Sequence, residues 1–185
     1  ATYLPEGQQF LDIAFSDKLN LKNTKTYQKM IFDALGLEYN RDTYKLKIDN
    51  AYKEDFKEKN SIKEDEIIVG INLGTAKRWP SKAWKKQYII DLIKKLPYKV
   101  IILGGPHEIE LQKEIAELTG AIPNDPKNTD QEFFSVVDIC NVVITGDTFA
   151  LHVALGLKKP TVALLFCTSA NEIETYDLAT KFISP

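Results

Sequence analysis

The sequence is poor in the residues that build disulfide frameworks and metal sites. Among 185 residues it has two cysteines, Cys140 and Cys167, and two histidines. Neither cysteine has a neighbour at the spacing of a zinc motif, and two isolated cysteines do not build the framework of a small secreted domain. We therefore expect a reduced, cytoplasmic protein that holds no metal and no cofactor.

Several other signals are missing. The sequence has no apolar run of about eighteen residues and no basic segment leading into an apolar one at its start, so we expect neither a spanning helix nor a secretion signal. Its formal net charge is −2, which gives no electrostatic case for a nucleic-acid partner. The motifs G-x-G-x-x-G, G-x-x-x-x-G-K-[ST] and G-x-S-x-G are absent as well. Their absence argues against a standard nicotinamide dehydrogenase, a P-loop NTPase and a hydrolase elbow.

The composition changes near residue 66, and this change predicts two parts. Residues 1–66 are rich in Lys, Asn, Tyr and Asp. Their patterns predict a helix over 27–35 capped by Thr24 or Thr26 and stopped by Gly36, a short strand over 44–48, a charged helix over 51–60 and a polar linker over 61–66. Elements this weak do not build an independent core. We interpret them as the end of a domain whose body is absent.

Residues 67–185 alternate aliphatic strands with amphipathic helices. Strands are predicted over 67–72, 100–103, 121–122, 142–145 and 161–165. Helices are predicted from the cap Ser81 to Pro97, from Pro106 to Gly120, over 131–137 and over 149–156. The apolar stripe of the first is formed by Trp84, Tyr88, Leu92 and Leu96, with Ile89 and Ile93 beside it. Such alternation implies right-handed crossovers. The fold class is therefore α/β, a doubly wound parallel sheet with a small N-terminal helical or extended appendage.

Two loops at the carboxyl ends of predicted strands have the composition of an anion site. The loop 73–81 places Thr75 and Lys77 between a strand and a helix, and the loop 145–149 opens a helix. A diphosphate is bound by backbone N–H groups, hydroxyls and cations in such a position. Each loop also has a plain structural explanation, since Lys77 can be a solvated charge and the polar residues before the second helix can be caps.

In order along the chain, these segments resemble glycosyltransferase family 9, the ADP-heptose:lipopolysaccharide heptosyltransferases. Residues 77–80 (KRWP) are similar to the K-x-W-P segment of that family, and 102–106 (ILGGP) to its second-strand turn. Residues 146–164 (GDTFALHVALGLKKPTVAL) resemble its diagnostic stretch, D-[ST]-G-x-x-H-x-A-x-A-x-x-x-P-x-[VL]-A-[LI]. The resemblance covers residues 67–183.

The resemblance implies the GT-B architecture, in which two Rossmann-like domains face each other across a cleft and the C-terminal one holds the donor. Residues 67–185 would be this donor-binding domain, and residues 1–66 the remnant of the acceptor domain plus the linker. The donor-binding residues that it implies are Thr75, Lys77, Glu108, Asp147, Thr148, Phe149 and His152.

Roles carry over from the family by position. Thr75 and Lys77 would contact the diphosphate or the sugar of the donor. Asp147, Thr148 and the N–H groups that open the next helix would take the phosphates and nearby sugar hydroxyls, and His152 would line the same pocket. The family holds the ribose with an acidic residue after the Gly-Gly turn.

The ribose residue has two candidates, and three positions depart from the family pattern. His107 and Glu108 both follow the Gly-Gly turn, and we choose Glu108 because a carboxylate accepts both ribose hydroxyls. Phe149 stands where the family has glycine, and Phe166 and Cys167 stand where it has Gly-Pro. Bulky residues here would narrow the donor site, change the nucleotide that fits, or mark a member that has lost donor binding.

The implied reaction is inverting transfer of a sugar from a nucleotide-diphosphate sugar, similar to ADP-heptose, to a lipopolysaccharide or related lipid-linked glycan. The general base would come from the missing N-terminal domain, so no catalytic residue is expected in this chain. That domain would also make any peripheral contact with the inner membrane. The alternatives are a non-catalytic nucleotide or nucleotide-sugar binding module and a scaffold domain. Nothing in the residues selects the sugar, the base, the acceptor or the oligomeric state.

The first prediction concerns turnover. The 185-residue chain alone should transfer no sugar, because the acceptor domain and its base are not among residues 1–185. The measurement is product formation from a nucleotide-sugar donor and a glycan acceptor. Measurable transfer by the chain alone would refute the expectation.

Overall fold

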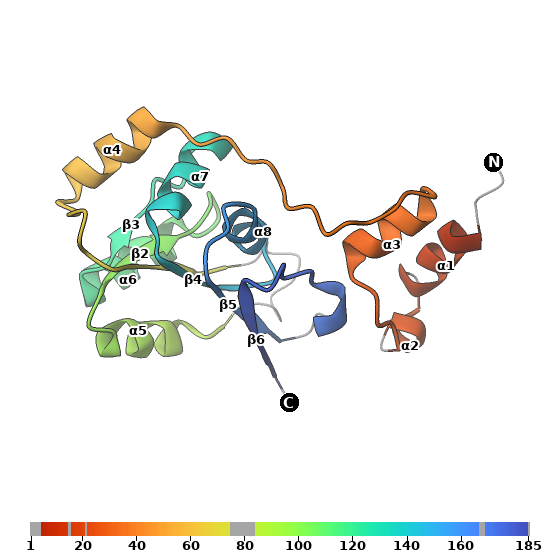
Figure 1. The fold of residues 1–185 in the computed structure, drawn as a ribbon. Helices are drawn as coiled ribbons and strands as arrows, with labels where there is room; N and C mark the ends of the chain where they lie inside the picture. Colours follow the sequence, from red (N-terminus) through yellow and green to blue (C-terminus); the bar gives the residue numbers. More distant parts are fainter. Residues whose placement is uncertain (1–4, 15, 21, 75–83, 167–168, 185) are drawn as a thin grey trace.

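The computed structural model describes residues 5–14, 16–20, 22–74, 84–166 and 169–184 (Figure 1). The helices in these ranges are α1 (Pro5–Ala14), α2 (Asp17–Asn20), α3 (Tyr27–Ala34), α4 (Asn50–Lys59), α5 (Lys86–Lys95), α6 (Ile109–Thr119), α7 (Asp130–Ile139) and α8 (Phe149–Gly156). The strands are β1 (Ile68–Asn72), β2 (Lys99–Leu103), β3 (Ile122–Pro123), β4 (Val142–Gly146), β5 (Thr161–Leu165) and β6 (Ala179–Ile183).

The strands form one parallel sheet, which confirms the predicted fold class. Its order is β3-β2-β1-β4-β5-β6, and every neighbouring pair is parallel. The chain moves outward from β1 to β3 and then returns to place β4 on the other side of β1. In an open sheet the crevice for a ligand lies at this reversal, outside the carboxyl ends of the strands.

Strand β1 is buried along its whole length, as a central strand between two helical layers must be. Gly70 is required at its middle because a Cβ there would stand 2.7 Å from the Cys140 sulfur and 3.1 Å from Leu103 Cδ1. Burial raises the pKa of the Cys140 thiol to about 12, so the thiol stays protonated. Cys140 is thus a packing residue.

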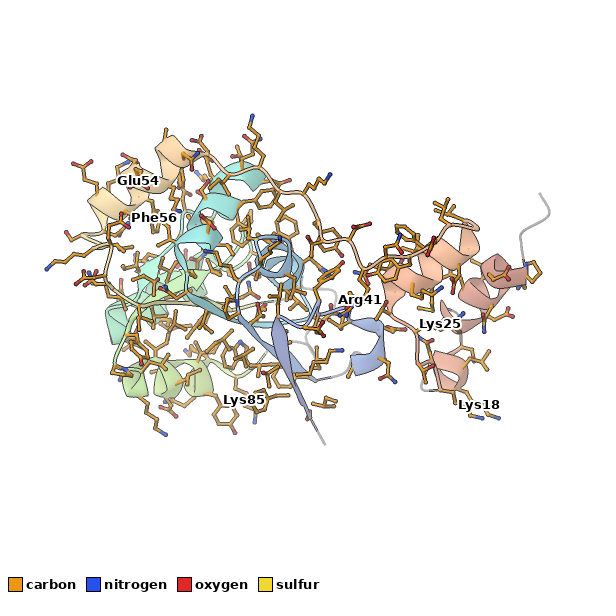
Figure 2. The ribbon with its side chains drawn as sticks, in the orientation of Figure 1. Lys18, Lys25, Arg41, Glu54, Phe56 and Lys85 are labelled. Carbon is orange, nitrogen blue, oxygen red and sulfur yellow. The ribbon has the colours of Figure 1, made fainter. Side chains whose placement is uncertain are left out.

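Helices cover both faces of the sheet, with α5 and α6 on one side and α4, α7 and α8 on the other (Figure 1). The alternation of strand side chains supplies both cores. The core under α5 and α6 includes Ile71, Ile89, Ile93, Ile102 and Ile115. The core under α4, α7 and α8 includes Phe56, Ile68, Ile101, Leu103, Val136 and Val153. Phe56 extends from α4 toward this second core in Figure 2.

Helix α5 differs from its prediction. Its N-cap is Lys85. The predicted cap, Ser81, lies outside the described ranges. Its buried face is centred on Ile89 and Ile93, whereas Tyr88 is 60% exposed. Of the predicted stripe, Trp84, Leu92 and Leu96 pack against the core, and the prediction is wrong at Tyr88, which faces the solvent.

Other boundaries agree more closely. Helix α8 and strand β5 span the predicted residues, and α6 ends at Gly120, whose φ of 74° is the left-handed cap that glycine supplies. Helix α6 begins at Ile109, so Pro106 belongs to the preceding turn and not to the first helical turn. Strand β6 was not predicted, since its residues Ala179–Ile183 mix polar and apolar side chains at a sheet edge.

The N-terminal part contains both predicted helices, as α3 and α4, but not the predicted strand. Helix α3 has the predicted cap, because Thr26 Oγ1 accepts a hydrogen bond from the N–H of Lys29. Residues 44–48 pair with no strand and instead run between α3 and α4. Their alternation is real, but the buried side packs on a helix: Leu46 Cδ1 would stand 2.8 Å from a Cβ at Gly156 of α8. Ile62, in the segment predicted as a linker, is also buried.

Two ion pairs and a hydrogen bond join the segment after α3 to the loop before β6. The Arg41 guanidinium lies 3.1 Å from Glu174 and 3.0 Å from Asp177, and the Tyr39 hydroxyl donates to Glu174 at 3.3 Å. Burial alone would raise the pKa of Glu174, but the N–H of Tyr176 and the Arg41 guanidinium outweigh it and keep this pKa below its usual range. In Figure 2, Arg41 lies between the N-terminal helices and the sheet domain.

Within the described ranges, no helix combines the length and the apolar character needed to cross a bilayer.

The next prediction concerns Asp138 of α7, which joins three segments. Its carboxylate lies 2.7 Å from the Lys53 ammonium of α4 and 3.0 Å from that of Lys159 before β5. Burial would raise the pKa of Asp138, but the two lysines outweigh it and hold the pKa below its usual range. A lowered folded-state pKa adds stability above the unfolded pKa, and this stability disappears as the pH falls through the folded value.

Asp138→Asn should therefore lower the free energy of unfolding by about 1.5–3 kcal/mol at pH 7, the range for hydrogen bonds to charged groups. The difference from wild type should shrink as the pH falls from the unfolded-state pKa of an aspartate, about 3.9, through the lower folded-state value. Urea unfolding at several pH values measures it, with Asp91→Asn on the exposed face of α5 as the control. A difference that does not change with pH would contradict the assignment.

Candidate functional site

A pocket of about 470 Å³ opens at the carboxyl ends of β1, β2, β3 and β4, where the strand order reverses. We call it the switch-point pocket. Its described lining comes from residues 72 and 74 after β1, 104–108 after β2, residues between 124 and 133 after β3, and 147–150 after β4. Each group follows a strand of the central sheet, so the fold brings together segments that are far apart in sequence.

Asn72 holds the floor of this pocket. Its side-chain amide donates to the carbonyl of Leu103 at 3.0 Å, which ties the end of β1 to the end of β2. Its Oδ1 accepts from the hydroxyl of Thr148 at 3.2 Å, and that hydroxyl lies 2.9 Å from Thr145 Oγ1. The Trp84 indole donates to the backbone carbonyl of Asn72 at 3.1 Å. The ends of three strands and the start of α8 therefore share one hydrogen-bond network.

The first turn of α8 is open toward the pocket. Thr148 occupies the N-cap position, but its hydroxyl is used by the Asn72 network and makes no capping hydrogen bond. Among the described residues, no side chain accepts from the N–H groups of Phe149 and Ala150. The interpretation of Thr148 as a plain side-chain cap is therefore wrong. The helix start keeps backbone donors and the positive end of its dipole for an anion.

Glu108 turns back over the ends of β1 and β2. Its Oε2 accepts from the N–H of Gly105 at 2.9 Å. A Cβ on Gly74 would stand 2.9 Å from Glu108 Oε1, so the glycine leaves room for this carboxylate. His107 lines the same pocket. Both candidates for the ribose position are thus at the pocket, and Glu108 is the one fixed by a backbone hydrogen bond.

Phe149 lies beside the helix start. Its ring stacks on Phe133 of α7 with centroids 5.7 Å apart and an interplanar angle of 22°, and lies 6.0 Å from the ring of Phe134. The side chain remains 55% exposed. Phe149, which stands where the resembled family has glycine, thus packs its ring against α7.

A second pocket, of about 500 Å³, lies between α3, the segment at 44–46 and α8. We call it the α3–α8 pocket. His152 lines it, with Nε2 4.0 Å from Asp147 Oδ1 and Nδ1 3.5 Å from the Tyr44 hydroxyl. That hydroxyl accepts from Gln28 Nε2 at 2.6 Å. Tyr44 and Gln28 were not predicted as site residues, because nothing local in the sequence indicates contact with a helix more than a hundred residues later.

Five of the seven predicted donor residues are brought together. Glu108 and Thr148 line the switch-point pocket, His152 lines the α3–α8 pocket, and Asp147 and Phe149 line both. Thr75 and Lys77 lie outside the described residues, although Gly74 just before them is at the first pocket.

The described lining of the switch-point pocket is acidic. It includes Glu108, Asp125, Asp130 and Asp147, and within the described residues it has no lysine or arginine. Over the same described ranges no group of three His, Cys, Asp or Glu side chains is placed to hold a metal ion. The described lining thus carries negative charge that would oppose a bound diphosphate.

An all-parallel sheet of this order, with a pocket at its reversal and an open helix start beside it, defines a Rossmann-like α/β domain of the kind found in GT-B glycosyltransferases. Residues 9–184 match the sequence profile of glycosyltransferase family 9 (heptosyltransferase). The chain belongs to this family.

Solved structures agree in fold. A glycosyltransferase family 9 protein from Veillonella parvula DSM 2008 is 22% identical with a TM-score of 0.76, over 88% of this chain and 50% of that one. E. coli ADP-heptose lps heptosyltransferase II is 22% identical with a TM-score of 0.66, over 80% and 48%. E. coli heptosyltransferase WaaC, solved with ADP, is 20% identical with a TM-score of 0.59, over 85% and 49%. This chain thus spans about half of each relative. A search of curated sequences found no significant match.

The site generates one stability prediction. Thr148→Val should lower the free energy of unfolding by about 1–2 kcal/mol, because Asn72 Oδ1 and the Thr145 hydroxyl lose a buried partner. Thr148→Ser keeps the hydroxyl and is the matched control. Chemical denaturation of both variants measures the difference. Equal stability of the two would show that the hydroxyl network does not hold the start of α8.

Proposed function

We propose that this chain is the donor-binding part of an inverting glycosyltransferase that moves a sugar from a nucleotide-diphosphate sugar to a lipopolysaccharide or related lipid-linked glycan. The observation that carries the proposal is the open N-terminus of α8 at the switch-point pocket. Membership of a family of glycosyltransferases supports it. So does the WaaC relative, whose structure contains ADP.

The diphosphate is assigned to the start of α8. Two orphan N–H groups and the helix dipole favour negative charge there, and no side chain competes for them within the described residues. The carboxylates of the pocket oppose a diphosphate, so a cation must offset them. The sequence supplies Lys77, three residues after Gly74, for this role. Thr75 adds a hydroxyl in the same loop.

The nucleoside is assigned to the side of the pocket formed by the ends of β2 and β3. Glu108 Oε2 is held by the N–H of Gly105, and its Oε1 remains on the pocket side as an acceptor for ribose hydroxyls. The ring of Phe133 provides an apolar surface in the same pocket. Neither contact distinguishes adenine from another base.

In the proposed reaction, the acceptor hydroxyl attacks the anomeric carbon and the nucleoside diphosphate departs from the opposite face. A base in an acceptor-binding domain removes the proton of that hydroxyl. The residues of this chain act on the leaving group: the N–H groups of α8 and the Lys77 ammonium stabilise the charge that develops on the diphosphate. The reaction would take place in the cytoplasm, with the acceptor domain meeting the inner membrane.

Calorimetric titration with ADP, UDP and GDP tests the proposal. One of these should bind, and Lys77→Ala should weaken its binding by about 1.5–3 kcal/mol, as expected for a lost charge-assisted contact. Lys85→Ala is the matched control, since this ammonium lies over the ring of Tyr88, outside the pocket. Failure of all three nucleotides to bind at about millimolar concentration, a free energy of about −4 kcal/mol, would overturn donor binding. An unchanged affinity in Lys77→Ala would remove that residue from the site.

A further inference from the structure

The two pockets meet at the start of α8. Asp147 and Phe149 line both of them, while the remaining lining of each pocket is separate. A nucleotide sugar is a long molecule with its diphosphate in the middle and a nucleoside and a sugar at its ends. If the diphosphate binds at the start of α8 and the nucleoside in the switch-point pocket, the sugar end is directed toward the α3–α8 pocket.

The α3–α8 pocket has the chemistry that suits a sugar ring. Its aromatic residues are Tyr27, Tyr44, Phe134 and Phe149. Its polar residues are Gln28, Asp147, His152 and Glu172. Aromatic faces pack on the C–H face of a pyranose, and carboxylate and amide groups accept and donate hydrogen bonds to its hydroxyls. Among its described lining residues there is no lysine or arginine, so the pocket favours a neutral hydroxyl-rich group over a phosphate.

Gln28 adds an independent observation. Its Nε2 is fixed by the Tyr44 hydroxyl at 2.6 Å, whereas its Oε1 is buried and accepts no hydrogen bond within the described part of the chain. A buried acceptor without a partner costs about 1–3 kcal/mol unless a ligand or water satisfies it. Gln28 lines the pocket, and its amide, oriented by Tyr44, keeps one acceptor that no described side chain or backbone group uses.

We propose that the α3–α8 pocket binds the sugar ring of the nucleotide-sugar donor, and that Gln28, Tyr44 and Glu172 recognise its hydroxyls. The proposal rests on the proposed function, because it takes the diphosphate to lie at the start of α8. Two of these three residues precede residue 66, in the part of the chain that sequence analysis separates from the donor domain. The N-terminal segment is thus a part of the donor site and selects the sugar.

The two histidines of the chain report the two pockets separately. His107 lines the switch-point pocket and His152 lines the α3–α8 pocket. NMR of the imidazole rings is recorded with ADP, UDP and GDP, and then with ADP-heptose, UDP-glucose and GDP-mannose. A nucleoside diphosphate should shift the His107 resonances, and its sugar-bearing form should shift those of His152 as well. Identical His152 resonances with and without the sugar would overturn the proposal.

Affinities provide the second measurement. The nucleotide sugar should bind more tightly than the bare diphosphate, and Tyr44→Phe and Glu172→Gln should each reduce this preference by about three- to tenfold, the range that one hydrogen bond contributes. Affinity for the bare diphosphate should not change. Tyr39→Phe is the matched control, because its hydroxyl bonds to Glu174 and its ring does not line the pocket. Thermal melting of each variant identifies any loss of folding.

The outcomes separate the two proposals. Nucleotide binding that shifts His107, with no sugar preference and no effect of Tyr44→Phe or Glu172→Gln, overturns the sugar pocket and leaves donor binding intact. An unshifted His107 with every nucleotide overturns the proposed function, and with it the basis for this pocket. A sugar preference lost in Tyr44→Phe and kept in Tyr39→Phe supports both.

Discussion

The architecture of the site depends on the side chain of Asn72. It stands at the end of the central strand, where the order of the sheet reverses, and its two polar atoms are shared between the neighbouring strand ends. Because Asn72 Oδ1 accepts a hydrogen bond from the Thr148 hydroxyl, that hydroxyl does not cap helix α8. The open helix start is therefore a consequence of how three strands are joined, and the position proposed for the diphosphate arises from packing of the sheet.

The sheet domain was largely predictable because its signals are local. A continuous apolar run such as Ile68–Asn72 can be buried only between two layers, and a glycine such as Gly120 ends a helix by its own backbone freedom. The exposure of Tyr88 on α5 was not predictable in the same way. Tyr88 fits an apolar stripe by spacing, but tertiary packing chose the adjacent isoleucines, and the strand β6 has no run of apolar residues to indicate it.

The same distinction separates the two halves of the site. Asp147 and Thr148 precede one helix and His152 lies in it, so their proximity could be predicted from sequence. The prediction that His152 lines the same pocket as Thr148 was wrong, because His152 lines the α3–α8 pocket. Tyr44 could not be predicted as a site residue. The alternation at 44–48 indicates one buried side but not which element covers it. Here the side is covered by a helix and not by a strand. The segment therefore contributes walls of a pocket, where a paired strand would have extended the sheet.

The contact between Leu46 and Gly156 has an evolutionary consequence. Gly156 is the last residue of α8, about 10 Å along the axis from the turn where the two pockets meet. A side chain there would stand 2.8 Å from Leu46 Cδ1 and 3.1 Å from Tyr44 Cβ, so one or both of these residues would have to shift. If the α3–α8 pocket holds the donor sugar as proposed, a substitution at Gly156 would alter sugar preference from outside the pocket.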